Sequence, residues 1–193
     1  WNSFLGEAPA REFDPNRYVN WRFFWDYSGG SVHENMSQQL AFWYKVLNLS
    51  IPLAVTMVGG VYLWLDGREV PDTMNVAMEL PGDILFTWDC GLGNNELSSG
   101  EFVLGTDGTI ARNQQIRYLP QKVNLPDGTE MVGQTPTAPR AMMQNFLDSI
   151  RTGGATDCPF ELGWRVSIAC RMAIESYRQG RTVRWDPERE EIV

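Results

Sequence analysis

Hydrophobic residues in the first thirty positions follow neither a helical nor a strand period. Aromatic side chains are interleaved there with Pro9, Pro15 and Gly6, residues that interrupt regular secondary structure. We therefore expect residues 1–30 to form a packed aromatic arm with one or two short helical turns.

The first regular pattern follows the pair Gly29-Gly30. Five apolar residues recur there at intervals of four, four, three and four: Val32, Met36, Leu40, Trp43 and Leu47. This spacing is typical of one buried face of an α-helix. It predicts a helix over residues 31–47, with Ser31 as its N-cap. A second, mostly polar face of the same helix carries Glu34 and Gln38.

Between residues 51 and 120 the pattern changes to short β-rich runs. The predicted strands are residues 55–58, 61–65, 74–80, 84–88, 101–104 and 109–111. Asp66-Gly67, Pro81-Gly82 and Asp107-Gly108 separate runs at hairpin spacing, which is too short for parallel crossovers. A mostly antiparallel sheet is therefore expected. The polar, proline-rich residues 120–137 are expected to form an excursion loop with room for a small hairpin.

Two amphipathic patterns predict helices over residues 139–151 and 160–179. The first ends at Gly153-Gly154 and the second ends before Gly180, as helices often do. A last strand is expected over residues 182–185, before a polar tail. This order of elements predicts an α+β fold, with helices packed on one face of a large, mostly antiparallel open sheet. We expect residues 1–193 to form a single domain.

Composition narrows the choice of partners. The 193 residues include 16 Lys+Arg against 24 Asp+Glu, which gives a net charge of -8. An acidic surface repels phosphate backbones, so neither nucleic acid nor a membrane is an expected partner. Cys90, Cys158 and Cys170 form no CxxC pair, and we expect buried thiols.

Candidate cofactor and metal sites are few. His33 is the only histidine, which excludes a metal site built from several histidines. Gly91-Leu92-Gly93 lacks the third glycine and the following helix of a dinucleotide-binding motif. We therefore expect neither a metal site nor a cofactor site in this chain.

The polar face of the first predicted helix is the candidate site. It points either to solvent or into a cleft beside the aromatic arm. Flat rings and hydrogen-bonding groups in this region suit a polyhydroxylated ligand, which has both C–H faces and hydroxyl edges. The candidate catalytic residues are Glu34 and Gln38. The candidate substrate-binding residues are Arg17, Trp21, Asp26, Tyr27 and His33.

Seven blocks of sequence, in order and over nearly the whole chain, resemble a known family. They are Trp1–Pro9, Phe13–Trp21, Phe24–Gly30, Asp72-Thr73, Leu104–Thr109, Asn145–Ile150 and Arg184–Pro187. They are similar to the C-terminal domain of the glucose-fructose oxidoreductase, inositol dehydrogenase and MocA (Gfo/Idh/MocA) family. The resemblance implies a full-length protein whose N-terminal Rossmann domain, missing here, binds NAD or NADP. It also implies a homo-oligomer formed through the open sheet face, and a chain that is inactive by itself.

The resemblance further implies site residues on the first helix. Family dehydrogenases usually carry an Asp there and a His four residues later, and the matching positions are Glu34 and Gln38. The amide of glutamine does not titrate, so Gln38 cannot act as a general base. His33 is offset from Glu34 by about 100° around an α-helix and is a poor substitute.

Three functions remain open. The first is a sugar or polyol oxidoreductase whose acid/base group is Glu34 or a lysine of the missing domain. The second is a non-catalytic binding or assembly module. The third is a nicotinamide-dependent, glycoside-cleaving relative. We favour the oxidoreductase and expect a cytoplasmic location.

Overall fold

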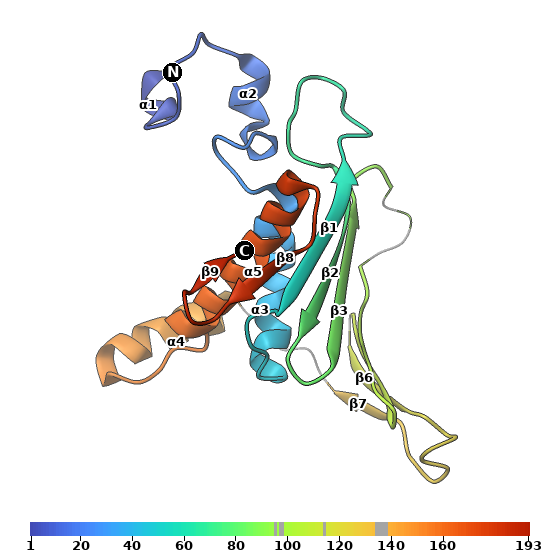
Figure 1. Ribbon diagram of the computed structural model, residues 1–193. Helices are drawn as coiled ribbons and strands as arrows, with labels where there is room; N and C mark the ends of the chain where they lie inside the picture. Colours follow the sequence, from blue (N-terminus) through green and yellow to red (C-terminus); the bar gives the residue numbers. More distant parts are fainter. Residues whose placement is uncertain (95, 97–98, 114, 134–138) are drawn as a thin grey trace. The chain divides into compact units, whose positions relative to one another are not determined.

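A computed structural model of the chain describes residues 1–94, 96, 99–113, 115–133 and 139–193 (Figure 1). The chain divides into two compact units, residues 1–93 with 158–193, and residues 94–157. The expected α+β class and antiparallel strand pairing are confirmed. The strands are distributed over two sheets.

The larger unit contains a sheet in which the described strands follow the order β3-β2-β1-β8-β9. These strands are β1 (Ala54–Gly60), β2 (Thr73–Leu80), β3 (Ile84–Gly91), β8 (Val183–Asp186) and β9 (Glu191–Ile192). Every second residue of β2 from Met74 to Leu80 is buried, because successive side chains of a strand point to opposite faces. One face of the sheet therefore builds the core. Strand β9 was not predicted.

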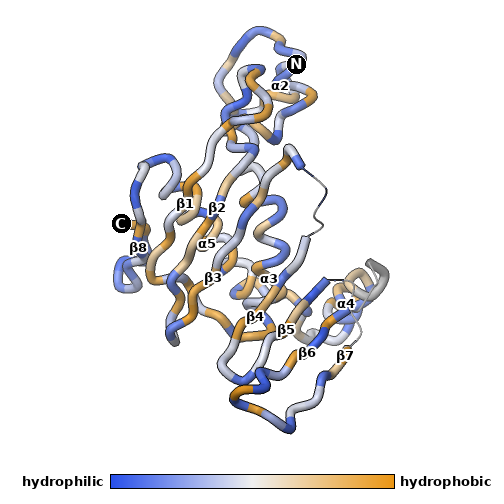
Figure 2. The backbone as a smooth tube through the Cα atoms, turned by 90° about the vertical axis from the view of Figure 1, so that its right-hand side faces the viewer, coloured by the Kyte–Doolittle hydropathy of each residue, from blue (hydrophilic) through white to orange (hydrophobic). Residues whose placement is uncertain are grey.

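Helices α3 (Ser37–Val46) and α5 (Phe160–Gln179) cover that face of the sheet. Figures 1 and 2 both show them on the same side of β1, β2 and β3. The apolar stripe predicted from Val32 to Trp43 is buried, whereas Leu47 lies just after α3 and is exposed. Both helices thus bury the faces that their sequence periods indicate.

The predicted strand over residues 61–65 is wrong. Strand β1 ends at Gly60, and the backbone N–H groups of Tyr62, Leu63 and Trp64 donate to the Asp72 carboxylate at 3.1, 2.8 and 3.2 Å. Because a side chain accepts these hydrogen bonds, no strand partner is needed. The hairpin expected at Asp66-Gly67 is replaced by a loop that Asp72 holds, and β1 pairs with β2 instead.

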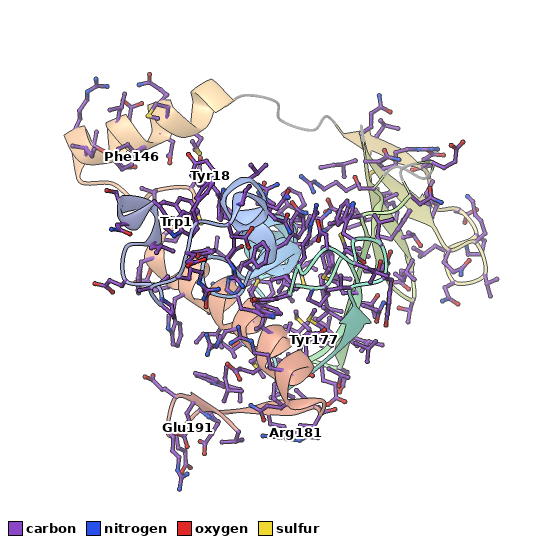
Figure 3. All side chains as sticks on the ribbon, turned by 90° about the horizontal axis from the view of Figure 1, so that it is seen from above. Trp1, Tyr18, Phe146, Tyr177, Arg181 and Glu191 are labelled. Carbon is purple, nitrogen blue, oxygen red and sulfur yellow. The ribbon has the colours of Figure 1, made fainter. Side chains whose placement is uncertain are left out.

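The aromatic arm forms with three short helical segments, where one or two were expected. These are α1 (Asn2–Leu5), α2 (Pro15–Val19) and the 3₁₀ turn η1 (Trp21–Phe23). Trp1 stacks on Phe4 at 5.4 Å and meets Tyr18 edge-on at 6.5 Å between ring centroids. Figure 3 shows Trp1 and Tyr18 close together. The rings of the arm pack mainly on one another.

In the smaller unit the described strands form a sheet in the order β4-β5-β6-β7. They are β4 (Glu101–Leu104), β5 (Gly108–Arg112), β6 (Ile116–Pro120) and β7 (Met131–Gly133), and helix α4 (Pro139–Thr152) follows. The antiparallel pairing of β7 with β6 supplies the small hairpin allowed for in the loop over residues 120–137. Residues 134–137 of that loop lie outside the described residues. Strand β6 was not predicted.

None of the helices in the described part of the chain has the length and apolar character needed to cross a membrane.

Candidate functional site

Gly30 sets the direction in which the chain enters the first helix. Gly30 has a φ of +61°, and a Cβ atom there would stand 2.2 Å from Val70 Cγ1. Its N–H donates to Ser28 Oγ at 2.9 Å. A side chain at position 30 is excluded both by the left-handed backbone and by Val70. The tight turn therefore fixes where the helix begins.

The helix opens with a π-helical turn, η2 (Val32–Met36), before α3 continues it. The N–H of Ser37 donates to the carbonyl oxygen of Val32, five residues earlier. Ser31 already has helical dihedral angles and makes no side-chain cap bond, so its predicted role as N-cap is wrong. Single π-helical turns are rare and often occur at functional sites. Nothing in the residue pattern pointed to this one.

A hollow of about 460 Å³, open to solvent, lies along this turn. It is lined by Trp21, Arg22, His33, Glu34, Asn35, Ser37 and Gln38. We call it the first hollow. Four of the seven candidate residues meet here: Trp21, His33, Glu34 and Gln38. In an ideal α-helix His33 would point about 100° away from Glu34, yet both line this hollow.

Glu34 is held by partners on both of its carboxylate oxygens. Oε1 accepts a hydrogen bond from Ser28 Oγ at 3.1 Å, and Oε2 pairs with Arg22 Nε at 3.0 Å. A carboxylate has about four lone-pair positions. Glu34 is thus oriented by the turn before the helix and retains positions that a ligand hydroxyl can approach.

Gln38 is oriented by its own helix. Its Nε2 donates to the backbone oxygen of Glu34 at 2.6 Å. The carbonyl oxygen of the amide accepts and the second N–H donates, so Gln38 is suited to bind a hydroxyl group. Ser37 Oγ donates to the His33 carbonyl oxygen in the same manner.

A second hollow of about 400 Å³ adjoins His33. Its lining is Trp25, Tyr27, Ser28, Gly29, His33, Arg171, Ile174 and Arg178. Tyr27, a predicted substrate-binding residue, lies here, and His33 borders both hollows. Partial withdrawal of the imidazole from water and the nearby Arg171 cation lower the pKa of His33.

Arg17 and Asp26 line neither hollow. Arg17 Nη1 pairs with Asp26 Oδ2 at 3.1 Å and its Nη2 with Glu69 Oε1 at 2.5 Å. The guanidinium also lies 4.2 Å from the centroid of the Phe24 ring. Arg11 completes the cluster through Asp26 at 2.5 Å. The structure thus places these two candidates in an ion-pair cluster that ties the arm to the loop around Glu69.

Several lining residues were missed by sequence reasoning. Arg22, Asn35 and Ser37 join the first hollow, and Arg171 and Arg178 join the second. The last two are seven residues apart on α5, which puts them on one side of the helix. That spacing indicates from the sequence alone that the two arginines share one side of a helix. The proximity of α5 to the turn after the arm has no such signal, because it depends on tertiary packing.

Two features bear on metal and dinucleotide binding among the described residues. No group of three or more His, Cys, Asp or Glu side chains in this part of the chain could hold a metal. Gly91 ends β3, and the N–H of Leu92 donates to the Asp72 carbonyl oxygen at 2.9 Å. Among the described residues the next element is β4, so this part of the structure shows no helix N-terminus after Gly93 that could receive a pyrophosphate.

Comparison with known proteins gives likeness in structure only. No family model matches the sequence, and no curated protein matches it. Levoglucosan dehydrogenase in complex with NADH and levoglucosan aligns with a TM-score of 0.70 and 15% identity, over 89% of this chain and 54% of that one. Aldose-aldose oxidoreductase from Caulobacter crescentus, complexed with glycerol, aligns with a TM-score of 0.67 and 21% identity, over 90% and 52%.

A third solved structure is the NAD-binding protein from Listeria innocua, with a TM-score of 0.65, 17% identity and coverage of 85% and 54%. The chain therefore shares the fold of about half of each of these proteins.

Proposed function

We propose that this chain is the substrate-binding and oligomerisation domain of a Gfo/Idh/MocA-type, NAD(P)-dependent oxidoreductase that acts on a sugar or polyol. The likeness in fold to half of a levoglucosan dehydrogenase and of an aldose-aldose oxidoreductase supports this assignment. NAD or NADP would be held by a domain outside this chain, as the resemblance to the family implies and as the match to only about half of each relative allows.

The observation that carries the proposal is the placement of Glu34 in the first hollow. Glu34 shares the hollow with hydrogen-bonding side chains and with Trp21, a combination that suits the hydroxyls and C–H faces of a sugar. Oxidation of an alcohol requires a group that removes the hydroxyl proton. Among the candidate residues that line the first hollow, Glu34 combines a titratable carboxylate with a fixed orientation.

The neighbours of Glu34 take supporting roles in this proposal. Gln38 binds a second hydroxyl through its amide, and Trp21 offers its ring to the C–H face of the ligand. Arg22 and Ser28 hold the carboxylate in place. Such positioning counts, because a catalytic base must lie within hydrogen-bond reach of the proton that it removes.

The proposal is tested in a protein that includes the upstream segment. We expect nicotinamide reduction with a sugar or polyol, and a loss of about 10² to 10⁴ in kcat for Glu34→Gln. Glu161→Gln is the matched control, because Glu161 is exposed in the first turn of α5 and lines neither hollow. Activity unchanged by Glu34→Gln would remove Glu34 as the base and favour a lysine of the upstream domain.

The assembly part of the proposal has its own basis. Within the described residues of the larger unit, α3 and α5 cover one face of the sheet, and Val58 and Leu85 are strongly exposed. We propose that the outer face of this sheet pairs with another copy of the chain. Light scattering should give the mass of an oligomer, and a strictly monomeric solution would contradict this part.

A further inference from the structure

The second hollow differs chemically from the first. Helix α5 contributes Arg171, Ile174 and Arg178 to it, three residues at the spacing of a single helix face. The opposite side is made by the turn that precedes η2, including Ser28 and Gly29. Two arginines therefore border a concave surface whose lining contains no Asp or Glu.

Arg178 is available to a ligand. Its guanidinium carbon lies 4.4 Å from the centroid of the Trp25 ring, and stacking on an aromatic face leaves the N–H edges of the plane free. Among the described residues, no carboxylate lies within ion-pair distance of Arg178.

Arg171 is the second cation of this hollow. Its Nη2 pairs with Glu175 Oε1 at 2.5 Å, one turn further along α5, and its side chain is 58% exposed. The Glu175 side chain is only 19% exposed, but ion pairs between residues one turn apart on a helix surface contribute little energy. Arg171 can therefore turn one N–H edge to a ligand while another keeps the contact with Glu175.

We infer that the second hollow is a subsite for an anionic oxygen group, a carboxylate or a phosphate, on the same substrate whose hydroxyls occupy the first hollow. This inference rests on the proposed function, because it takes the first hollow as the polyol site. His33 borders both hollows, so one ligand can extend from one to the other. The substrate class is then a sugar acid or a sugar phosphate.

The chemistry of arginine supports this assignment. Its planar guanidinium donates two parallel N–H bonds to the oxygens of a carboxylate or phosphate, and these charge-assisted bonds are stronger than neutral ones. The first hollow instead holds Glu34, paired with Arg22, which leaves no unpaired cation for an anion. The two hollows therefore divide the recognition of hydroxyls and negative charge between them.

Binding to this chain can be followed through its single histidine. The imidazole Hε1 resonance of His33 is unique in the proton NMR spectrum, since there is one histidine. We would titrate the chain at fixed pH and constant ionic strength with inorganic phosphate, gluconate, glucitol 6-phosphate and neutral glucitol. Phosphate should shift the resonance with saturation, whereas the same ionic strength of sodium chloride should not.

Variants locate the site. Arg178→Gln should weaken phosphate binding about tenfold or more, the effect of losing one charge-assisted contact, and Arg171→Gln should weaken it less. Arg184→Gln on β8 is the control, because Arg184 lines neither hollow. Circular dichroism of each variant confirms folding. Phosphate binding that is absent, or equal in Arg178→Gln and wild type, would overturn the inference.

The ligand series separates the possible outcomes. Tighter binding of gluconate than of glucitol identifies a carboxylate ligand, and tighter binding of glucitol 6-phosphate identifies a phosphate ester. If glucitol binds as well as both anions, the polyol site stands and the anion subsite fails. In a last outcome, phosphate binds, but Glu34→Gln does not weaken the binding of glucitol or of the anionic polyols. The proposed polyol site then fails while an anion site remains.

Discussion

The imidazole of His33 packs directly on the backbone of Gly29. A Cβ atom at position 29 would stand 2.2 Å from His33 Cδ2 and 2.9 Å from Ile174 Cδ1. Real atoms do not approach so closely, so the ring occupies the space that any other side chain would need. Because position 29 carries no side chain, the His33 ring can lie against the backbone there. His33 is the one residue that lines both hollows.

Gly29→Ala should displace the His33 ring and reshape both hollows. We expect the free energy of unfolding to fall by about 1–3 kcal/mol, the usual cost of overpacking, and the His33 Hε1 resonance to shift. Combining Gly29→Ala with His33→Ala should recover part of the loss, because the clashing ring is gone. Urea denaturation measures the energies, and additive losses in the double variant would argue against the contact.

Gly163→Ala is the control for this experiment. A Cβ atom at Gly163 meets nothing within 4 Å, and the residue lies inside α5. Alanine favours the helix over glycine by about 0.5–1 kcal/mol. This variant should therefore stabilise the protein in the same assay, and a loss of stability there would show that glycine replacement itself is harmful.

Asp72→Asn should destabilise the loop between β1 and β2. The buried carboxylate accepts N–H bonds from Tyr62, Leu63 and Trp64 and a bond from the Thr73 hydroxyl at 3.0 Å. An amide turns a donor toward donors, so we expect a loss of about 2 kcal/mol or more at pH 7. Asp66→Asn changes an exposed carboxylate that pairs with Arg68 at 3.1 Å, and it should cost less, about 0.5 kcal/mol.

The same carboxylate predicts a dependence on acid. Burial alone would raise the pKa of Asp72, but the donors around it outweigh burial and lower the pKa. The stabilisation that the ionised Asp72 carboxylate provides is complete when the pH is above its unfolded-state pKa of about 3.9. This stabilisation is lost as the pH falls through the lower pKa of the folded state. The free energy of unfolding should therefore fall less steeply with decreasing pH in Asp72→Asn than in the wild type. Identical slopes for the two proteins would contradict this prediction.

His33 should titrate below the ordinary histidine range. Withdrawal of the ring from water is the larger cause of the lowered pKa, and Arg171 is the smaller. The unfolded chain binds the proton more tightly, so stability falls as the pH drops through about 6.5 and stops falling below the folded pKa. Arg171→Gln should raise the NMR titration midpoint without restoring it fully. An unchanged midpoint would show that Arg171 does not act on His33.

The three thiols should differ widely in reactivity. Cys158 is exposed, Cys90 is half-buried and Cys170 is buried, and burial raises the pKa of Cys170 to about 12. The expectation that all three are buried is thus wrong for Cys158. We expect a thiol reagent at pH 8 to label Cys158 first and Cys170 after unfolding. A Cys158→Ser variant that still reacts rapidly and completely would contradict this order.

Local patterns predicted much of the fold. The stripe from Val32 to Trp43 and the turn at Pro81-Gly82 were correctly read, because packing and turn geometry agreed with the local residue pattern. The strand over residues 61–65 failed for the opposite reason. Its apolar residues suit a strand, but the distant carboxylate of Asp72 captures their backbone donors, and such a contact has no local signal.

The candidate site shows the same limit. Helical spacing placed Glu34 and Gln38 on one side of a helix, and the structure brings both to one hollow. The chemistry of Arg17 and Asp26 and their nearness in sequence predicted a place in the same site, whereas the structure places them outside both hollows, where Arg17 pairs with Asp26 and with Glu69. The residues on α5 depended on packing across more than 130 positions of chain, which no periodicity can reveal.

The π-helical turn over Val32–Met36 lets one helix both pack against the core and direct side chains to the first hollow. A π-helical turn contains one residue more than an ordinary helical turn. Residues after the turn keep the helical phase that packs α3 against the core, and the additional residue sets the direction in which the residues before it point. Deleting one residue in this turn would restore an ordinary turn and swing the preceding segment by about 100°. A single insertion or deletion there would therefore redirect the side chains that line the first hollow, and it would also disturb the packing of Val32, which belongs to the core.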